Sequence, residues 1–287
     1  MSEQHLATLL ISCPDRRGLV AGLAQVLSGH GANILDSDQH TDRGAGQFFQ
    51  RIVFDVAELT TDRGTLERAI AEVGERFSMN YRLTYALGPR KRAAIFVSKY
   101  DHCLYDLLLR HQQGELEGEV GMIVSNHPDL ERVAKQFDVP FFLRPKGKET
   151  KAGVEAQELQ LLVEHRIDLV ILARYMQILS DDFVRSFAGS IINIHHSFLP
   201  AFVGGRPHHR AHERGVKLIG ATAHYATAEL DEGPIIEQDV VRCSHRDTVS
   251  DLVRKGRDLE KLVLARAVRA HLADKVLTYS NKTVVFD

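Results

Sequence analysis

Residues 191–200 read IINIHHSFLP, and the rest of the chain is organised around this stretch. Its two isoleucines are typical of the end of a buried strand. Asn193 and His195 follow, so on an extended segment both side chains leave the same face. Downstream, residues 230–236 (LDEGPII) supply Asp231. A donating amide, an imidazole that moves a proton and a carboxylate that orients it predict a hydrolytic or acyl-transfer site. An Asn-x-His pair after a strand is also common in turns. The choice between a catalytic site and an ordinary turn therefore depends on the surrounding residues.

The chain before this stretch alternates between strand and helix patterns. Apolar runs without polar alternation, typical of strands buried on both faces, lie at 93–98, 120–125 and 168–173. This order predicts a doubly wound, mostly parallel α/β sheet, in which ligands bind beyond the carboxyl ends of the strands. Asn193 and His195 follow such an end. The sequence has no GxxxxGK[ST] loop and no GxGxxG turn, so nucleotide phosphates are not the expected ligand.

The first ninety residues follow a different pattern. Strand-like and helix-like segments occur in the order βαββαβ, at residues 7–12, 19–27, 32–38, 47–56, 61–77 and 81–87. This order predicts a ferredoxin-like unit. A Gly-Pro pair and three basic residues then mark a connector. We therefore expect two domains, at 1–88 and 93–287, joined by a linker at 89–92.

The composition is that of a globular protein with a sizeable core, because 44% of the residues are hydrophobic and 26% are charged. The net charge of -2 gives no general attraction to nucleic acid or membranes. The three cysteines form no CxxC pair, so neither a disulfide framework nor a thiolate zinc site is indicated. The N-terminus lacks a basic start before its short apolar run, and we expect a cytoplasmic protein.

A resemblance to a known family begins in the first domain. The turn at residues 15–21, DRRGLVA, makes the βαββαβ unit over roughly residues 5–88 similar to the ACT domain. ACT domains pair edge to edge and bind small amino acids, and a helix N-terminus suits a carboxylate. The resemblance implies a homo-oligomer and an effector site that includes Asp15, Gly18, Leu19 and Asn33. The alternative is a dimerising module without an effector.

The second domain, over about residues 92–270, resembles the folate-dependent formyltransferase fold. Three motifs carry the resemblance: residues 193–200 (NIHHSFLP), Asp231-x-Gly233, and residues 172–179 (LARYMQIL). The resemblance implies that Asn193, His195 and Asp231 form the catalytic set. It also implies a folate pocket lined by Met176, Gln177, Ile178, Leu179, Thr227 and Ala228.

The acceptor of the formyl group depends on the loop Ser98–Leu104 (SKYDHCL). In the glycinamide ribonucleotide transformylases, a Gly-Ser-Asn loop here holds the acceptor phosphate. This chain has no glycine in the loop, and Asp101 opposes an anion, so water is the expected acceptor. His102, Cys103 and His196 are candidates for shaping the pocket where an amine would otherwise sit.

With the ACT-like domain in front, nearly the whole chain is similar to the formyltetrahydrofolate deformylase family. This resemblance implies hydrolysis of 10-formyltetrahydrofolate to tetrahydrofolate and formate, which supplies formate and balances the one-carbon folate pool for purine synthesis. Folate is then a substrate, and neither nucleic acid nor membrane is an expected partner. Two other functions stay open: a formyltransferase to an amine acceptor, and a regulatory binding protein whose second domain has lost activity.

Metal catalysis is the competing chemistry. The histidine-rich loop at residues 204–212 includes His208 and His212, which are four residues apart and suit one face of a helix. However, His212-Glu213 is not followed by the second histidine of an HExxH motif, and no cysteine is placed as a third ligand. We expect neither a metal nor a cofactor.

Overall fold

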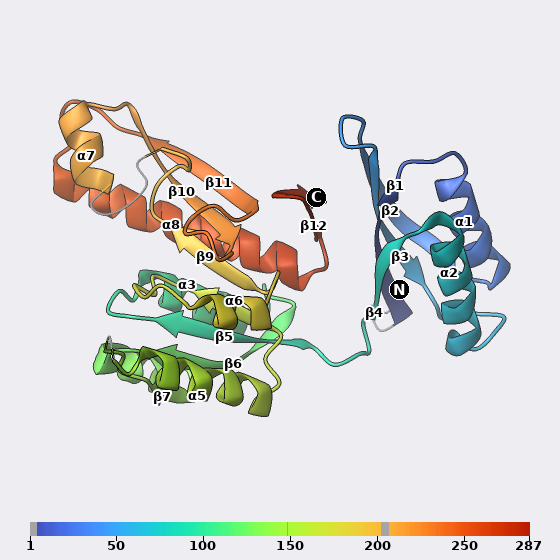
Figure 1. The fold of residues 1–287 in the computed structure, drawn as a ribbon, viewed down its shortest axis with the longest axis horizontal. Helices are drawn as coiled ribbons and strands as arrows, with labels where there is room; N and C mark the ends of the chain where they lie inside the picture. The colour runs from blue at the N-terminus through green and yellow to red at the C-terminus, as the bar shows by residue number, and fades with distance from the viewer. Residues whose placement is uncertain (1–4, 148, 202–206) are drawn as a thin grey trace. The chain divides into compact units, whose positions relative to one another are not determined.

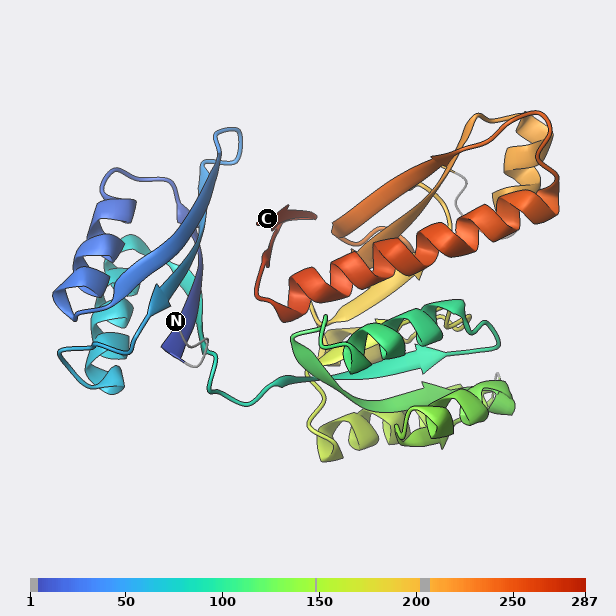
Figure 2. The same cartoon turned by 180° about the vertical axis from the view of Figure 1, so that it is seen from behind.

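The computed structural model describes residues 5–147, 149–201 and 207–287, which form two compact units (Figures 1 and 2). The first unit contains the chain up to Pro89 together with Asp274–Tyr279 and Val284–Asp287. The second unit contains Arg90–Ala273 and Ser280–Thr283. Among the helices in the described part of the chain, none is both long enough and apolar enough to cross a membrane.

The first unit has the predicted βαββαβ order. Its elements are β1 (Leu6–Pro14), α1 (Leu19–Gly29), β2 (Asn33–Asp42), β3 (Gln47–Asp55), α2 (Arg63–Phe77) and β4 (Asn80–Tyr85). The strands form an antiparallel sheet in the order β2-β3-β1-β4. Alternate residues such as Leu9 and Phe48 face one side of the sheet, where they pack with Leu23 of α1 and Leu66 of α2. The prediction of a ferredoxin-like unit is confirmed.

The C-terminal strands differ from the prediction, which placed residues 93–287 together in one domain. β12 (Val276–Tyr279) and β13 (Lys282–Val285) pair with each other, and the chain then ends at Phe286 and Asp287. Phe286 packs with Leu10 and Phe49, whose side chains leave the first unit's sheet on the face opposite Leu9 and Phe48. The physical reason is apolar burial, because this face of the sheet carries large hydrophobic side chains that need a cover.

The second unit is built on a seven-stranded sheet. Its elements are β5 (Lys91–Val97), α3 (His102–Gln112), β6 (Gly118–Ser125), η2 (Pro128–Leu130), α4 (Glu131–Gln136), β7 (Phe141–Leu143), α5 (Lys151–Glu164), β8 (Leu169–Leu172), α6 (Asp181–Ser186), β9 (Ile191–His195), α7 (Pro207–Arg214), β10 (Leu218–Tyr225), β11 (Ile235–Arg242) and α8 (Val249–Leu272). The strand order is β11-β10-β9-β8-β5-β6-β7. Neighbours from β9 to β7 run parallel, whereas β10 is antiparallel to both β9 and β11. The predicted doubly wound, mostly parallel sheet is confirmed.

Helices cover both faces of this sheet. Ala94 and Phe96 of β5 face a core with α5 and α6, whereas Ala93 and Ile95 contact the side where Leu107 of α3 lies (Figure 2). β5 is central, and the chain runs outward from it first through β6 and β7, and later through β8 and β9. The strand order therefore reverses at β5 and β8, where open α/β sheets leave a crevice for ligands.

Candidate functional site

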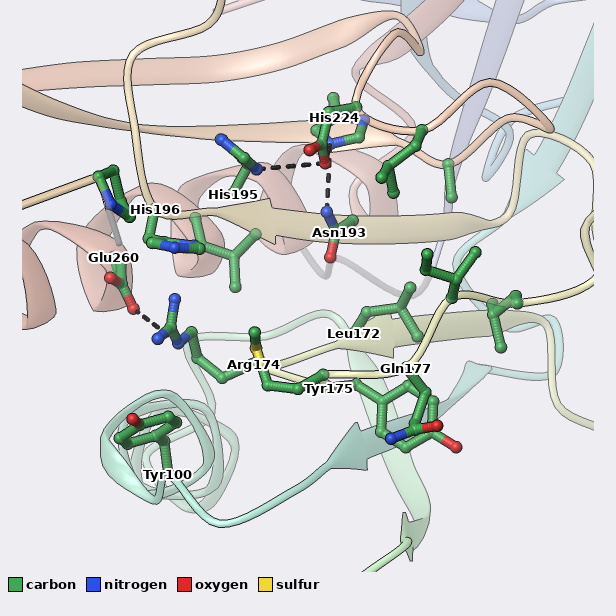
Figure 3. Close-up of a pocket in the computed structure, with 18 of the residues that line it drawn as sticks. Tyr100, Leu172, Arg174, Tyr175, Gln177, Asn193, His195, His196, His224 and Glu260 are labelled. Carbon is green, nitrogen blue, oxygen red and sulfur yellow. Dashed lines mark hydrogen bonds and ion pairs between the residues drawn. The ribbon is translucent and has the colours of Figure 1, made fainter. Parts of the chain in front are cut away.

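A cavity of about 500 Å³ opens at this crevice in the second unit. It is lined by residues that follow β5, β8, β9 and β10 and by residues of α7 and α8. Two polar clusters face it, as Figure 3 shows: Asn193, His195 and His224 lie together, and Arg174, Glu260 and Tyr100 form a separate group. All three predicted catalytic residues and all six predicted folate-binding residues line this one cavity.

His195 ends β9 and is held at both ring nitrogens. Its Nδ1 lies 3.2 Å from Oδ1 of Asp231, and its Nε2 lies 2.8 Å from Oγ of Ser197. The Ser197 hydroxyl donates in turn to the carbonyl oxygen of Ala201 at 2.8 Å, which leaves its oxygen free to accept from His195. These contacts fix the plane of the imidazole, and they suit an imidazolium that donates on both sides.

Asp231 reaches His195 from a tight turn. Its φ of 59° lies in the left-handed region, where a residue with a side chain is strained. Gly233 permits the turn, because a Cβ there would collide with the carbonyl oxygen of Tyr225. Burial raises the pKa of the Asp231 carboxyl, whereas the hydrogen bond and charge of the His195 imidazole lower it, and the net pKa is well below the usual value. Asp231 is therefore a carboxylate at neutral pH.

His224 is a site residue whose role beside Asn193 the sequence did not predict. Its Nδ1 donates to the carbonyl oxygen of Tyr225 at 3.0 Å, which leaves Nε2 as the acceptor in the neutral ring. The Nδ2 amide of Asn193 lies 3.2 Å from this Nε2 and donates to it. One hydrogen of the amide is thereby used, and the other is free to meet a ligand in the cavity. His224 thus orients Asn193.

The predicted folate loop forms an apolar wall of the cavity. The backbone N–H of Met176 donates to Oγ of Ser98 at 3.1 Å, and that of Ser180 donates to Oε2 of Glu155 at 3.2 Å. Met176 and Ile178 remain 55% and 63% exposed, which is unusual for large apolar side chains on a loop held at both ends. Such a surface is suited to an apolar part of a ligand.

The second polar cluster centres on Glu260 of α8, which is 2% exposed. Oε2 of Glu260 lies 2.8 Å from Nε2 of His102 and 3.5 Å from Nε of Arg174. Burial raises the pKa of the Glu260 carboxyl. His102 and Arg174 lower this pKa by more than burial raises it, so the net pKa is below the usual value. His102 and Cys103, predicted to shape the pocket, do not line the cavity in the part of the structure that is described; His102 contacts it through Glu260.

His196 and His208 line the cavity and face each other with ring centroids 6.3 Å apart. Burial, reinforced by Arg174, lowers the pKa of His196 to about 4. Burial also lowers the pKa of His208, although Glu260 opposes the shift. Of the histidine-rich loop predicted to matter, residues 202–206 lie outside the described residues, whereas Pro207–Arg214 forms α7. His212 is not among the described residues that line the cavity.

The residues predicted to bind an effector lie in the first unit. Gly18 precedes α1 with φ of 91°, Leu19 is buried, and Asp15 donates its backbone N–H to Gly46 at 2.9 Å. Asn33 begins β2 with its side chain exposed. Gly18 therefore has the conformation that the predicted anion-binding turn needs, and effector binding stays a prediction.

Comparison with known proteins defines the class first. Residues 91–268 match the family model described as formyl transferase, and residues 7–71 match the ACT domain. The second unit therefore has the formyl transferase fold. A glycinamide ribonucleotide transformylase from Symbiobacterium toebii has a TM-score of 0.65 and 30% identity, over 69% of this chain and 95% of that one.

Full-length relatives narrow the class. A formyltetrahydrofolate deformylase from Synechocystis sp. is 55% identical over 280 residues, 98% of each chain. One from Bacillus subtilis is 49% identical over 97% of this chain and 93% of its own. The crystal structure of a formyltetrahydrofolate deformylase from Pseudomonas syringae has a TM-score of 0.95 and 47% identity, over 98% of this chain and 94% of that one. The chain belongs to the formyltetrahydrofolate deformylase family.

Proposed function

We propose that this protein hydrolyses 10-formyltetrahydrofolate to tetrahydrofolate and formate. One observation carries the proposal: a half-buried amide, an imidazole and an ionised carboxylate line one cavity with an exposed apolar loop. The names of the full-length relatives support the same reaction. The pterin of the substrate would lie against Met176, Ile178 and Leu179, with Thr227 and Ala228 on the other side.

The reaction begins with attack of water on the formyl carbon. A C–O bond forms, the carbonyl oxygen becomes an oxyanion, and the C–N10 bond then breaks as N10 takes a proton. The second amide hydrogen of Asn193 would donate to the oxyanion, a contribution of roughly 3–4 kcal/mol for donors of this kind. The geometry supports this role because His224 holds the first hydrogen and so fixes the amide.

His195 and Asp231 would divide the remaining work. Both ring nitrogens of His195 have partners, which favours a charge opposite the oxyanion over a mobile proton carrier. Both imidazoles contact Asp231 at Oδ1, which leaves Oδ2 to orient the attacking water and accept its proton. The two groups form one hydrogen-bonded pair.

The decisive experiment supplies purified protein with 10-formyltetrahydrofolate and no amine. Release of stoichiometric formate supports the hydrolase. Product that forms only when an amine is added would identify the runner-up, a formyltransferase. Folate binding without turnover would identify a regulatory binding protein. Asn193→Ala should reduce turnover by on the order of 100-fold with folding intact, and near wild-type rates would remove Asn193 from the scheme.

We also propose a physiological role and a regulatory role for the protein. The formate would supply purine synthesis, so a strain without this protein should need purines or formate under conditions where no other formate source operates. The ACT unit would bind a small amino acid and pair with a second copy. Light scattering with and without each amino acid, compared between the wild type and Gly18→Val, tests both points.

A further inference from the structure

The second polar cluster contains more charged and hydrogen-bonding groups than are needed to line a cavity. It comprises Tyr100, His102, Arg174 and Glu260, and we refer to it as the Arg174 cluster. Tyr100 and His102 follow β5, Arg174 follows β8, and Glu260 comes from α8. β5 and β8 are the parallel neighbours at which the strand order reverses. The cluster therefore occupies the crevice between their carboxyl ends, where an open α/β sheet usually holds a ligand.

Charge and stacking hold the cluster rigidly. The Arg174 guanidinium lies 4.9 Å from the centre of the Tyr100 ring and 3.5 Å, through Nε, from Glu260 (Figure 3). His102 fixes the same Glu260 oxygen at 2.8 Å. The side chains of Arg174 and Glu260 are 12% and 2% exposed. Arg174 also has a φ of 60°, a strained conformation that turns it away from the course of the strand.

Two nitrogens of Arg174 have no hydrogen-bond partner in the part of the chain that the structure describes. Nε and Nη1 are both buried, and Nε has only the 3.5 Å ion pair with Glu260. Buried donors in native proteins are nearly always satisfied, by protein or by ordered water. Arg174 lines the cavity and its side chain is 12% exposed, so the part of the guanidinium that is not buried is suited to a water molecule there.

A metal centre is a poorer explanation of the cluster. His102, Cys103 and Glu260 place ligand atoms within 4.8 Å of one another. The cation of Arg174 already contacts Glu260, and it would repel a metal ion at the same carboxylate. Burial, reinforced by Glu260, also raises the pKa of the Cys103 thiol well above its usual value, which disfavours the thiolate that binds metals.

We propose that the Arg174 cluster selects the formyl acceptor, with Arg174 as the specificity-determining residue. It fills the crevice from which a second substrate would reach the formyl carbon, and it leaves room there for water. Its positive charge also repels a protonated amine. This inference rests on the proposed function. With water, a C–O bond replaces C–N10 and formate results; with an amine, a C–N bond replaces C–N10 and a formamide results, N10 gaining a proton in each case.

Removal of Arg174 should change the product. Arg174→Gly opens the crevice, and glycine adopts the positive φ without strain. The variant would also expose the Glu260 carboxylate, still held by His102, as an acceptor for the N–H groups of an amine. Without the guanidinium, the crevice would have room for an amine and a carboxylate that attracts it.

The test uses glycinamide as the probe amine and measures how formyl groups divide between formate and N-formylglycinamide, with a no-enzyme blank. Wild-type protein should give formate only. Arg174→Gly should raise the ratio of formamide to formate at least tenfold, in proportion to the glycinamide concentration. Arg257→Ala is the matched control, because Arg257 lines the same cavity and lies 5.6 Å from the Tyr100 ring but has no ion pair with Glu260 among the described residues. Its product ratio should equal that of the wild type.

Tyr100→Ala provides a second route, since it removes the surface on which Arg174 stacks. If Arg174→Gly does not fold, a raised formamide ratio in Tyr100→Ala supports the proposal and an unchanged ratio overturns it. Formate as the sole product of both folded variants would also overturn it, as would complete loss of turnover in both, which would assign Arg174 to catalysis. Formate release by the wild type without amine is scored separately, so failure of the proposed function is distinguishable.

Discussion

Asp231 and Glu260 face the same cavity, and each carboxylate lies between two basic side chains. Asp231 contacts His195 at 3.2 Å and His224 at 3.7 Å. Glu260 contacts His102 at 2.8 Å and Arg174 at 3.5 Å. In both places the pKa of the carboxyl lies below its usual value against the effect of burial, held there by His195 at Asp231 and by His102 and Arg174 at Glu260. The electrostatic plan of the two clusters is the same.

The difference lies in the second partner and in the backbone. A guanidinium stays charged at every accessible pH, whereas imidazoles titrate near neutrality. Asp231 also sits on a strained turn, whereas Glu260 lies within the 24-residue helix α8. The comparison indicates that a carboxylate on a turn with titratable partners is reactive, and that a carboxylate on a helix with a permanently charged partner is structural. Four predictions test this distinction.

The largest effect is expected at the reactive carboxylate. Asp231→Asn keeps the shape of the side chain but removes the charge that holds His195, so turnover should fall by on the order of 1000-fold. The free energy of unfolding should also decrease, because the lowered pKa of Asp231 means that its charge stabilises the fold, but by less than about 2 kcal/mol, since its imidazole partners can become neutral. Single-turnover formate release and urea unfolding measure the two quantities. A loss below tenfold would contradict the reactive role.

Glu260→Gln should show the reverse pattern. It leaves the buried Arg174 guanidinium without a counter-ion, so the free energy of unfolding should decrease by about 3 kcal/mol. Hydrolysis by the folded fraction should fall less than tenfold. Urea unfolding followed by circular dichroism is the measurement, with the surface variant Asp182→Asn as control, since that residue makes only exposed contacts. Unchanged stability would show that Glu260 is not a structural ion.

The pH dependence of stability sharpens the same comparison. The folded-state pKa of Glu260 is lowered, so its ionic contribution is fully present above the unfolded pKa of about 4.3 and is lost as the pH falls through the folded value. The difference in unfolding free energy between the wild type and Glu260→Gln should therefore stay constant from pH 8 to pH 6 and shrink below about pH 4. A difference that grows toward acid would reverse the sign and refute the assignment.

The smallest effect is expected at His196, which follows His195 in sequence and lies between the two clusters in the cavity (Figure 3). Burial and then Arg174 lower its pKa to about 4, so the ring is already neutral from pH 6 to pH 8. His196→Asn should change turnover by less than about threefold and leave the shape of the pH–rate profile unaltered in that range. The matched variant His195→Asn should lose both activity and the profile. An altered profile for His196→Asn would give it a titrating role.

Sequence reasoning identified Asn193, His195 and Asp231 because each follows a strand or begins a turn, where the sheet places ligands. Whether they act as predicted is not decided by their proximity. The contact of His224 with Asn193 was not predicted, because His224 interrupts the apolar strand β10 and only the register against β9 sets it opposite Asn193. No local pattern encodes that pairing.

Glu260 did leave a signal in the sequence. Gly256, Leu259, Glu260 and Val263 fall at helical spacing on the buried side of α8, so a carboxylate occupies an apolar position. Such a residue must have a partner. Its partners, His102 and Arg174, lie more than 80 residues away in the chain, and only the folded structure identifies them.

The last strands have a practical consequence for anyone who wishes to study the amino-terminal module in isolation. A fragment ending at residue 88 would lack Phe286 and the hairpin, and would leave Leu10 and Phe49, each no more than 1% exposed in the intact chain, bare to solvent. Such a fragment is expected to aggregate. A single-chain version with residues 274–287 spliced back through a flexible connector should be far better behaved, and a fusion partner is better attached at the amino terminus.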